Sequence, residues 1–140
     1  MNKRLSPPEA LIYCMFTAST VDRTVSNDEL ARINSIVQEL PAFKGYERDW
    51  FSDESQACGK VLGKPGGLEA VLDLVAETLP AELRETAYVL ACEVVETDLK
   101  FRSEERRFLE MLAAKFNLDR LVVAALERAV KARHRNVSHG

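Results

Sequence analysis

An acidic segment of this chain, Asp22-Arg23-Thr24-Val25-Ser26-Asn27-Asp28-Glu29, recurs in altered form as Asp98-Leu99-Lys100-Phe101-Arg102-Ser103-Glu104-Glu105. Each copy starts with an aspartate, has a large apolar residue three positions later and ends in two acidic residues. An apolar series then follows in the same register, as Leu30, Ile33, Ile36 and Leu40 in the first copy and Phe108, Leu109, Leu112 and Phe116 in the second. We interpret this pattern as two helix–acidic loop–helix units in a pseudo-duplicated domain.

Helical spacing of apolar residues extends to both sides of these segments. Before the first segment, Ser6-Pro7-Pro8-Glu9 is typical of a helix start, and it predicts a helix from about Pro7 to Thr20. Apolar residues lie on most sides of this helix, which indicates that protein nearly surrounds it. They are Leu11, Ile12, Cys14, Met15, Phe16 and Ala18. After the segment, Ser26 and Glu29 form a capping box that opens a helix ending before Pro41.

The rest of the chain continues the helical pattern. Residues 47–62 fit either one helix or two short helices broken near Ser52-Asp53. Trp50-Phe51 is predicted to be core, with a docking patch as the alternative. A glycine-rich turn at 63–67 is followed by predicted helices at 68–79, from Pro80 to the second acidic segment, at 103–116 and at 120–133, with Asn117 and Asp119 as caps. No segment has the pattern of a strand. We therefore predict a single all-α domain over residues 1–140, with about seven helices and frayed residues 135–140.

Composition excludes several classes of protein. The chain has 140 residues, 46% of them hydrophobic and 29% charged, which is typical of a globular domain. Its net charge of −3 argues against nucleic acid as the main partner, because phosphate binding needs a cationic face. No apolar run is long enough to cross a bilayer, and no secretion signal is apparent. Three widely spaced cysteines favour a reducing cytoplasm, with Cys14 and Cys92 as buried apolar residues.

The acidic segments are where chemistry is expected. Asp22 and Asp98 should each follow a helix C-terminus, where an anionic side chain lies beside unpaired carbonyl oxygens. With Glu29 and Glu105 they would supply oxygen ligands for a hard divalent cation if the two units pack face to face. The alternative is that these acids cap helices and face water. In the second copy, Ser103 is expected to be the cap, which would place Glu105 one position early.

The paired segments resemble the tellurite-resistance TerB family, over roughly residues 8 to 130. The matching stretches are 21–33 and 97–109, and Leu79-Pro80-Ala81-Glu82-Leu83-Arg84 is also similar to family members. This resemblance implies an all-helical, cytoplasmic, non-enzymatic bacterial domain of the stress response. It also implies divalent metal binding (Ca²⁺, Mg²⁺, Mn²⁺ or Zn²⁺), with Asp22, Glu29, Asp98 and Glu105 as ligands.

One departure from the family concerns the residue after each aspartate. The family has glycine there, whereas this chain has Arg23 and Leu99. Glycine adopts a left-handed backbone conformation at little cost, and Arg23 adds a cation beside the site. We therefore expect metal binding to be weakened or lost relative to family members that keep both glycines.

Three functions remain in competition. The first is a TerB-like stress-response domain that acts through a metal ion or another protein. The second is a metal-independent helical adaptor that binds another protein, and the third, ranked last, is a carboxylate-metal hydrolase. No nucleophile–base pair can be nominated, so we expect no catalytic residues. The basic end Lys131, Arg133, His134 and Arg135 is explained by the C-terminus of its own helix, with an anionic partner as the alternative.

Overall fold

The computed structural model describes residues 5–21, 25–97, 103–135 and 137. These residues form seven α-helices, one short 3-10 helix and no strand, so the all-α prediction is confirmed. The elements are α1 (Pro7–Thr20), α2 (Asn27–Glu39), η1 (Pro41–Phe43), α3 (Glu54–Leu62), α4 (Gly67–Thr78), α5 (Ala81–Thr97), α6 (Ser103–Lys115) and α7 (Arg120–Arg133). The fraying predicted for residues 135–140 falls mostly outside the described residues.

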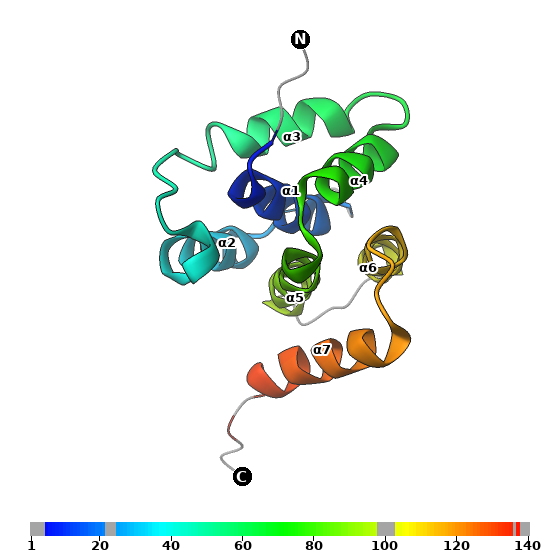
Figure 1. Ribbon diagram of the computed structural model, residues 1–140. Helices are drawn as coiled ribbons and strands as arrows, with labels where there is room; N and C mark the ends of the chain where they lie inside the picture. The colour runs from blue at the N-terminus through cyan, green and yellow to red at the C-terminus, as the bar shows by residue number, and fades with distance from the viewer. Residues whose placement is uncertain (1–4, 22–24, 98–102, 136, 138–140) are drawn as a thin grey trace.

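Helix α1 lies at the centre of the domain. It contacts α2, α3, α4, α5 and α6, and Figure 1 shows it between α3 above and α5 below. A helix that is apolar on all sides is stable only when it is covered on all sides. This is the case here, since six apolar side chains of α1 are fully buried: Ala10, Leu11, Ile12, Cys14, Met15 and Ala18. The prediction of a nearly surrounded first helix is confirmed.

Helix α5 is the second central element. It packs against α1, α2, α6 and α7, and its buried side chains include Ala87, Tyr88, Leu90, Ala91, Cys92, Val94 and Val95. The terminal helix α7 packs mainly against α5, and Figure 1 shows it at the edge of the domain. The three cysteines are free and buried, as predicted for Cys14 and Cys92.

Several helix ends follow their predicted caps. Ser6 and Glu9 form a capping box, in which the Ser6 N–H donates to Glu9 Oε1 at 2.8 Å. After α6, Asn117 has φ of 55°, the left-handed conformation that ends many helices. The Asp119 side chain then accepts a hydrogen bond of 2.8 Å from the Leu121 N–H at the start of α7. Local sequence therefore determines these boundaries.

Residues 47–62 agree in part with the second alternative, because a helix begins directly after the break predicted near Ser52-Asp53, whereas the residues before the break form a turn. Only Glu54–Leu62 is helical, because Asp49 stabilises a turn ahead of it. Its carboxylate accepts hydrogen bonds from the N–H groups of Phe51 (3.1 Å) and Ser52 (3.4 Å), which compete with helical pairing. Trp50 is buried as predicted, and its Nε1 donates to Asn34 Oδ1 at 3.2 Å. Phe51 was wrongly predicted to be core, since it is 51% exposed.

The glycine-rich stretch at 63–67 forms the turn between α3 and α4. Gly66 has φ of +72°, which favours glycine. Gly67 packs so tightly against the end of α3 that a Cβ atom would lie 2.2 Å from the Val61 carbonyl oxygen. Both glycines therefore serve a close helix–helix connection, as predicted.

Candidate functional site

Glu29 lies in the first turn of α2, directly after the first acidic segment. The predicted capping box is confirmed: the Ser26 N–H donates to Glu29 Oε1 at 2.9 Å, and the Glu29 N–H donates to Ser26 Oγ at 3.0 Å. The side chain is not at the surface, since Glu29 is only 1% exposed. The alternative prediction was that this glutamate caps the helix and faces water. The capping is confirmed, whereas the exposure to water is wrong, because Glu29 is buried.

Glu105 occupies the corresponding place in the second copy. Helix α6 is described from Ser103, and the residue before it lies outside the described residues, so the predicted cap at Ser103 is not tested. Glu105 is the third residue of the described part of α6, as Glu29 is the third residue of α2. Glu105 is 0% exposed, so this carboxylate also fails to face water.

The two first turns share one pattern of burial. In α2, Asn27 and Asp28 are exposed before the buried Glu29, and in α6, Ser103 and Glu104 are exposed before the buried Glu105. A buried carboxylate needs compensation for its lost hydration. The partial positive charge at a helix N-terminus supplies part of that compensation, and a cation could add to it.

The two predicted aspartate ligands, Asp22 and Asp98, lie outside the described residues. The helix before Asp22 ends at Thr20, as the sequence predicted, and the described part of the helix before Asp98 extends to Thr97. Within residues 5–21, 25–97, 103–135 and 137, no group of three or more histidine, cysteine or acidic side chains could hold a metal ion. A complete ligand set would thus need groups beyond Glu29 and Glu105.

Described residues next to the first acidic segment and at the end of the second line the same groove. A groove of about 570 Å³ is lined by Thr20 and Val21 at the end of α1 and by Glu104, Arg107 and Phe108 at the start of α6. Direct contact between α1 and α6 supports this arrangement. Val21, which precedes the first acidic segment, therefore lies on the same side of the domain as Glu104, which precedes Glu105. Most of the remaining lining is apolar and includes Phe16, Leu62, Leu68 and Met111.

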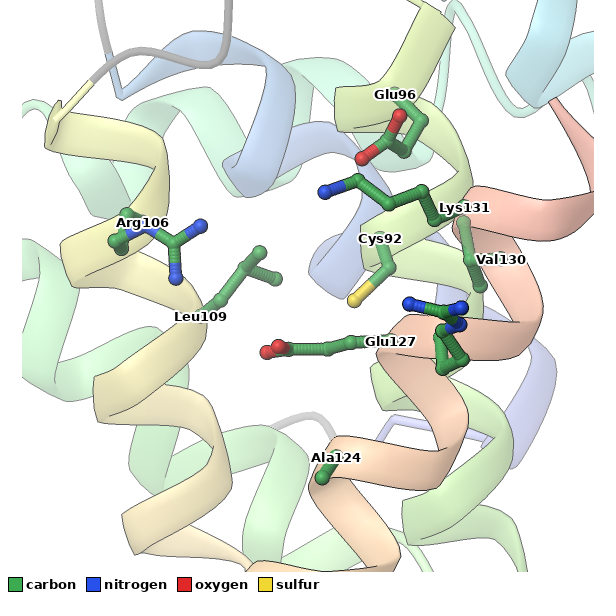
Figure 2. Close-up of a pocket in the computed structure, with 9 residues that line it drawn as sticks. Cys92, Glu96, Arg106, Leu109, Ala124, Glu127, Val130 and Lys131 are labelled. Atoms are coloured by element: carbon green, nitrogen blue, oxygen red, sulfur yellow. The ribbon is translucent and has the colours of Figure 1, made fainter. Parts of the chain in front are cut away.

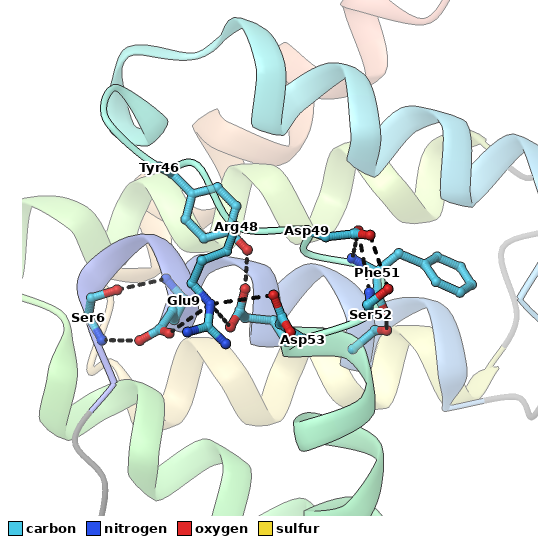
Figure 3. A network of polar contacts seen from close by, with 10 residues as sticks. Ser6, Glu9, Tyr46, Arg48, Asp49, Phe51, Ser52 and Asp53 are labelled. Carbon is cyan, nitrogen blue, oxygen red and sulfur yellow. Dashed lines mark hydrogen bonds and ion pairs between the residues drawn. The ribbon is translucent and has the colours of Figure 1, made fainter.

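A polar cluster that the sequence did not reveal ties residues 46–54 to α1 (Figure 3). The Arg48 Nε atom lies 3.2 Å from Glu54 Oε1, 3.7 Å from Asp53 Oδ2 and 3.9 Å from Glu9 Oε2. The Tyr46 hydroxyl also donates a hydrogen bond to Glu54. Burial raises the pKa of Glu54, while Tyr46 and Arg48 act to lower it. We assign this cluster a structural role, because its single arginine is already shared among three carboxylates.

A second cluster joins the end of α7 to α5. Arg133 Nε lies 2.7 Å from Glu93 Oε1, and His134 Nε2 lies 2.9 Å from Glu93 Oε2. Two residues of the predicted basic end thus meet an anionic partner within the chain. The sequence offered no signal for this contact, since Glu93 is 40 residues before Arg133.

Comparisons with known proteins add no family assignment. Neither the protein-family models, nor the curated proteins, nor the solved structures include a match to this chain. Within the part of the chain that the structure describes, no helix combines the length and apolar character required to cross a membrane.

Proposed function

We propose that this chain is a non-catalytic, TerB-like helical domain of the cytoplasmic stress response that binds a divalent cation through its two acidic motifs. The observation that carries the proposal is the equivalent placement of Glu29 and Glu105. Each is buried, each is the third residue of the described part of its helix, and each ends an acidic segment of the sequence. Asp22 and Asp98 complete the proposed ligand set. The shared groove beside Val21 and Glu104 supports a site to which both loops contribute.

Calorimetric titration with Ca²⁺, Mg²⁺, Mn²⁺ and Zn²⁺ tests the metal-binding part. We expect at least one cation to bind, and we expect binding to be lost in the Glu29→Gln/Glu105→Gln variant. Glutamine keeps the shape of the side chain and can still accept the capping hydrogen bond, so the fold should survive. The matched control is Asp28→Asn/Glu104→Gln, which removes the neighbouring exposed acids. No heat with any of the four cations would contradict metal binding.

The second candidate is a metal-independent adaptor, and the groove between α1, α3, α4 and α6 favours it. Its mostly apolar lining is suited to a side chain or helix of another protein. Pull-down from the native host with the Asp22→Asn/Asp98→Asn variant separates the two functions. A partner that is retained by this variant but lost from Met111→Glu would favour the adaptor. A partner lost from the aspartate variant alone would favour the metal-dependent function.

A further inference from the structure

A second hollow lies between α5, α6 and α7, and its lining includes Glu96 and Arg106, which flank the second acidic segment in the sequence. Its volume is about 240 Å³, and side chains of all three helices surround it (Figure 2). Its innermost side chains are uncharged, since Cys92, Leu109 and Val130 are 4%, 2% and 2% exposed. The hollow therefore combines an apolar base with an opening to solvent.

Charged side chains form the rim of this hollow. Arg106 comes from α6, Arg128 and Lys131 come from α7, and the acidic residues are Glu96 and Glu127. Figure 2 shows Arg106 and Lys131 reaching toward the hollow from opposite sides. Three basic groups against two acidic groups leave the rim with a net positive charge.

One of the acidic groups is already engaged by a neutral donor. The hydroxyl of Tyr88, which is 1% exposed, donates a hydrogen bond to Glu127 Oε2. Burial raises the pKa of Tyr88, so the hydroxyl stays protonated and remains a donor. This hydrogen bond fixes the position of the Glu127 side chain and leaves the balance of three basic against two acidic groups at the rim unchanged.

The thiol at the base of the hollow belongs to Cys92. Burial raises the pKa of Cys92 to about 12, so it is a neutral thiol near pH 7. A neutral, buried thiol is a poor nucleophile, which favours binding over covalent chemistry at this hollow.

We propose that this hollow binds a small organic acid, with its carboxylate between the basic side chains of α6 and α7 and its apolar part against Leu109, Val130 and Cys92. Arginine and lysine form charge-assisted hydrogen bonds with carboxylate oxygens. The volume is below the roughly 300–1,000 Å³ of pockets for drug-sized ligands, so the occupant is small. This site is separate from the proposed metal site and does not depend on it.

Two-dimensional NMR titration of the full chain with benzoate tests the proposal, with acetate and inorganic phosphate as comparison probes at constant ionic strength. We expect benzoate to bind saturably, to shift amide signals around the hollow and to bind more tightly than the other two anions. The Arg128→Gln/Lys131→Gln variant should weaken benzoate binding about tenfold, the equivalent of one charge-assisted hydrogen bond. Arg120→Gln, an exposed arginine at the start of α7, is the matched control and should leave affinity unchanged.

A second variant tests the hollow without altering charge. Ala124 is exposed and lines the hollow, so Ala124→Trp should obstruct it, leave the fold intact and abolish benzoate binding. The proposal is overturned if benzoate does not bind or if neither variant weakens binding. Equal affinity for the three anions would also overturn it, because it would indicate general attraction to positive charge without use of the apolar base.

Discussion

At the scale of single residues, Gly67 and Gly59 provide a matched pair. A Cβ atom on Gly67 would lie 2.2 Å from the Val61 carbonyl oxygen and 2.8 Å from Leu62 Cα, and both of these are backbone atoms. Relief would require α3 and α4 to move apart, so we expect Gly67→Ala to lower the free energy of unfolding by about 1–3 kcal/mol. Urea denaturation measures this change.

The control for that prediction lies in α3. A Cβ atom on Gly59 would meet nothing within 4 Å, and alanine favours the helix over glycine. Gly59→Ala should therefore raise the free energy of unfolding by about 0.5–1 kcal/mol. If both variants had the same effect, the close approach at Gly67 would not limit stability.

Glu93 gives a residue-scale prediction that depends on pH. Burial acts to raise the pKa of Glu93, but its hydrogen bonds to Arg133 and His134 outweigh burial and lower that pKa below the ordinary 4.5. The stabilisation is thus present above pH 4.5 and is lost as the pH falls through the lowered pKa. At pH 7, Glu93→Gln should reduce the free energy of unfolding by about 1–3 kcal/mol, and this deficit should shrink in acid below pH 4.5.

Denaturation over a range of pH measures the Glu93 effect. Glu85→Gln, an exposed acid on the same helix, is the control and should change stability by no more than about 0.5 kcal/mol. A Glu93→Gln deficit that stays constant from neutral pH into acid would contradict the proposed role of the ion pairs.

Sequence reasoning predicts some residue environments better than others. The S-x-x-E signature at Ser26 is a local pattern, and both hydrogen bonds that it predicts are present. The burial of Glu29 and Glu105 is not a local property, because it depends on how distant helices cover the two first turns. A buried glutamate and a solvated one look the same in the sequence.

At the scale of elements, α7 differs from the other helices in how it is attached. It packs mainly against α5, and Val130 is its single buried residue among those the structure describes. Leu121, near its start, is 80% exposed. Elements with little buried apolar surface open at a lower free energy than the global fold.

We therefore expect the amide hydrogens of α7 to exchange faster than those of α1. Hydrogen exchange followed by mass spectrometry of peptides from both helices measures the difference. Replacing the ion pair between Glu93 and Arg133 by Glu93→Gln weakens the contact between α5 and α7 and should widen the difference, whereas Glu85→Gln should not. Equal protection of the two helices would contradict this description of α7.

Element boundaries were predictable wherever the determinant was local. Pro7, Ser26 and Asp119 determine helix starts within one turn of sequence. The break before α3 was one of two alternatives from the sequence. The turn ahead of it was not predicted, because the Asp49 side chain and the Trp50–Asn34 hydrogen bond replace a helix that the apolar spacing alone allows. The pairing of Glu93 with Arg133 and His134 was missed for a related reason, since no periodicity relates residues on separate helices.

For the whole molecule, the all-α fold class could be predicted from the sequence. The proposed function could not, because it depends on how the helices pack. Apolar positions around Leu11 and Met15 already indicated a central helix, and α1 is that helix. Whether the two acidic motifs lie close together depends on tertiary packing. Contact between α1 and α6 supports their proximity, and Asp22 and Asp98 lie outside the described residues. The shared metal site therefore remains a proposal.

An anomalous-scattering map from crystals grown with Mn²⁺ tests the central proposal most directly. We predict a peak within ligand distance, about 2.0–2.6 Å, of a carboxylate oxygen of Glu29 or Glu105, with Asp22 or Asp98 completing its coordination. Crystals of the Glu29→Gln/Glu105→Gln variant should lack that peak. A map with no Mn²⁺ at either glutamate, or with Mn²⁺ bound only elsewhere on the molecule, would contradict the proposed metal site.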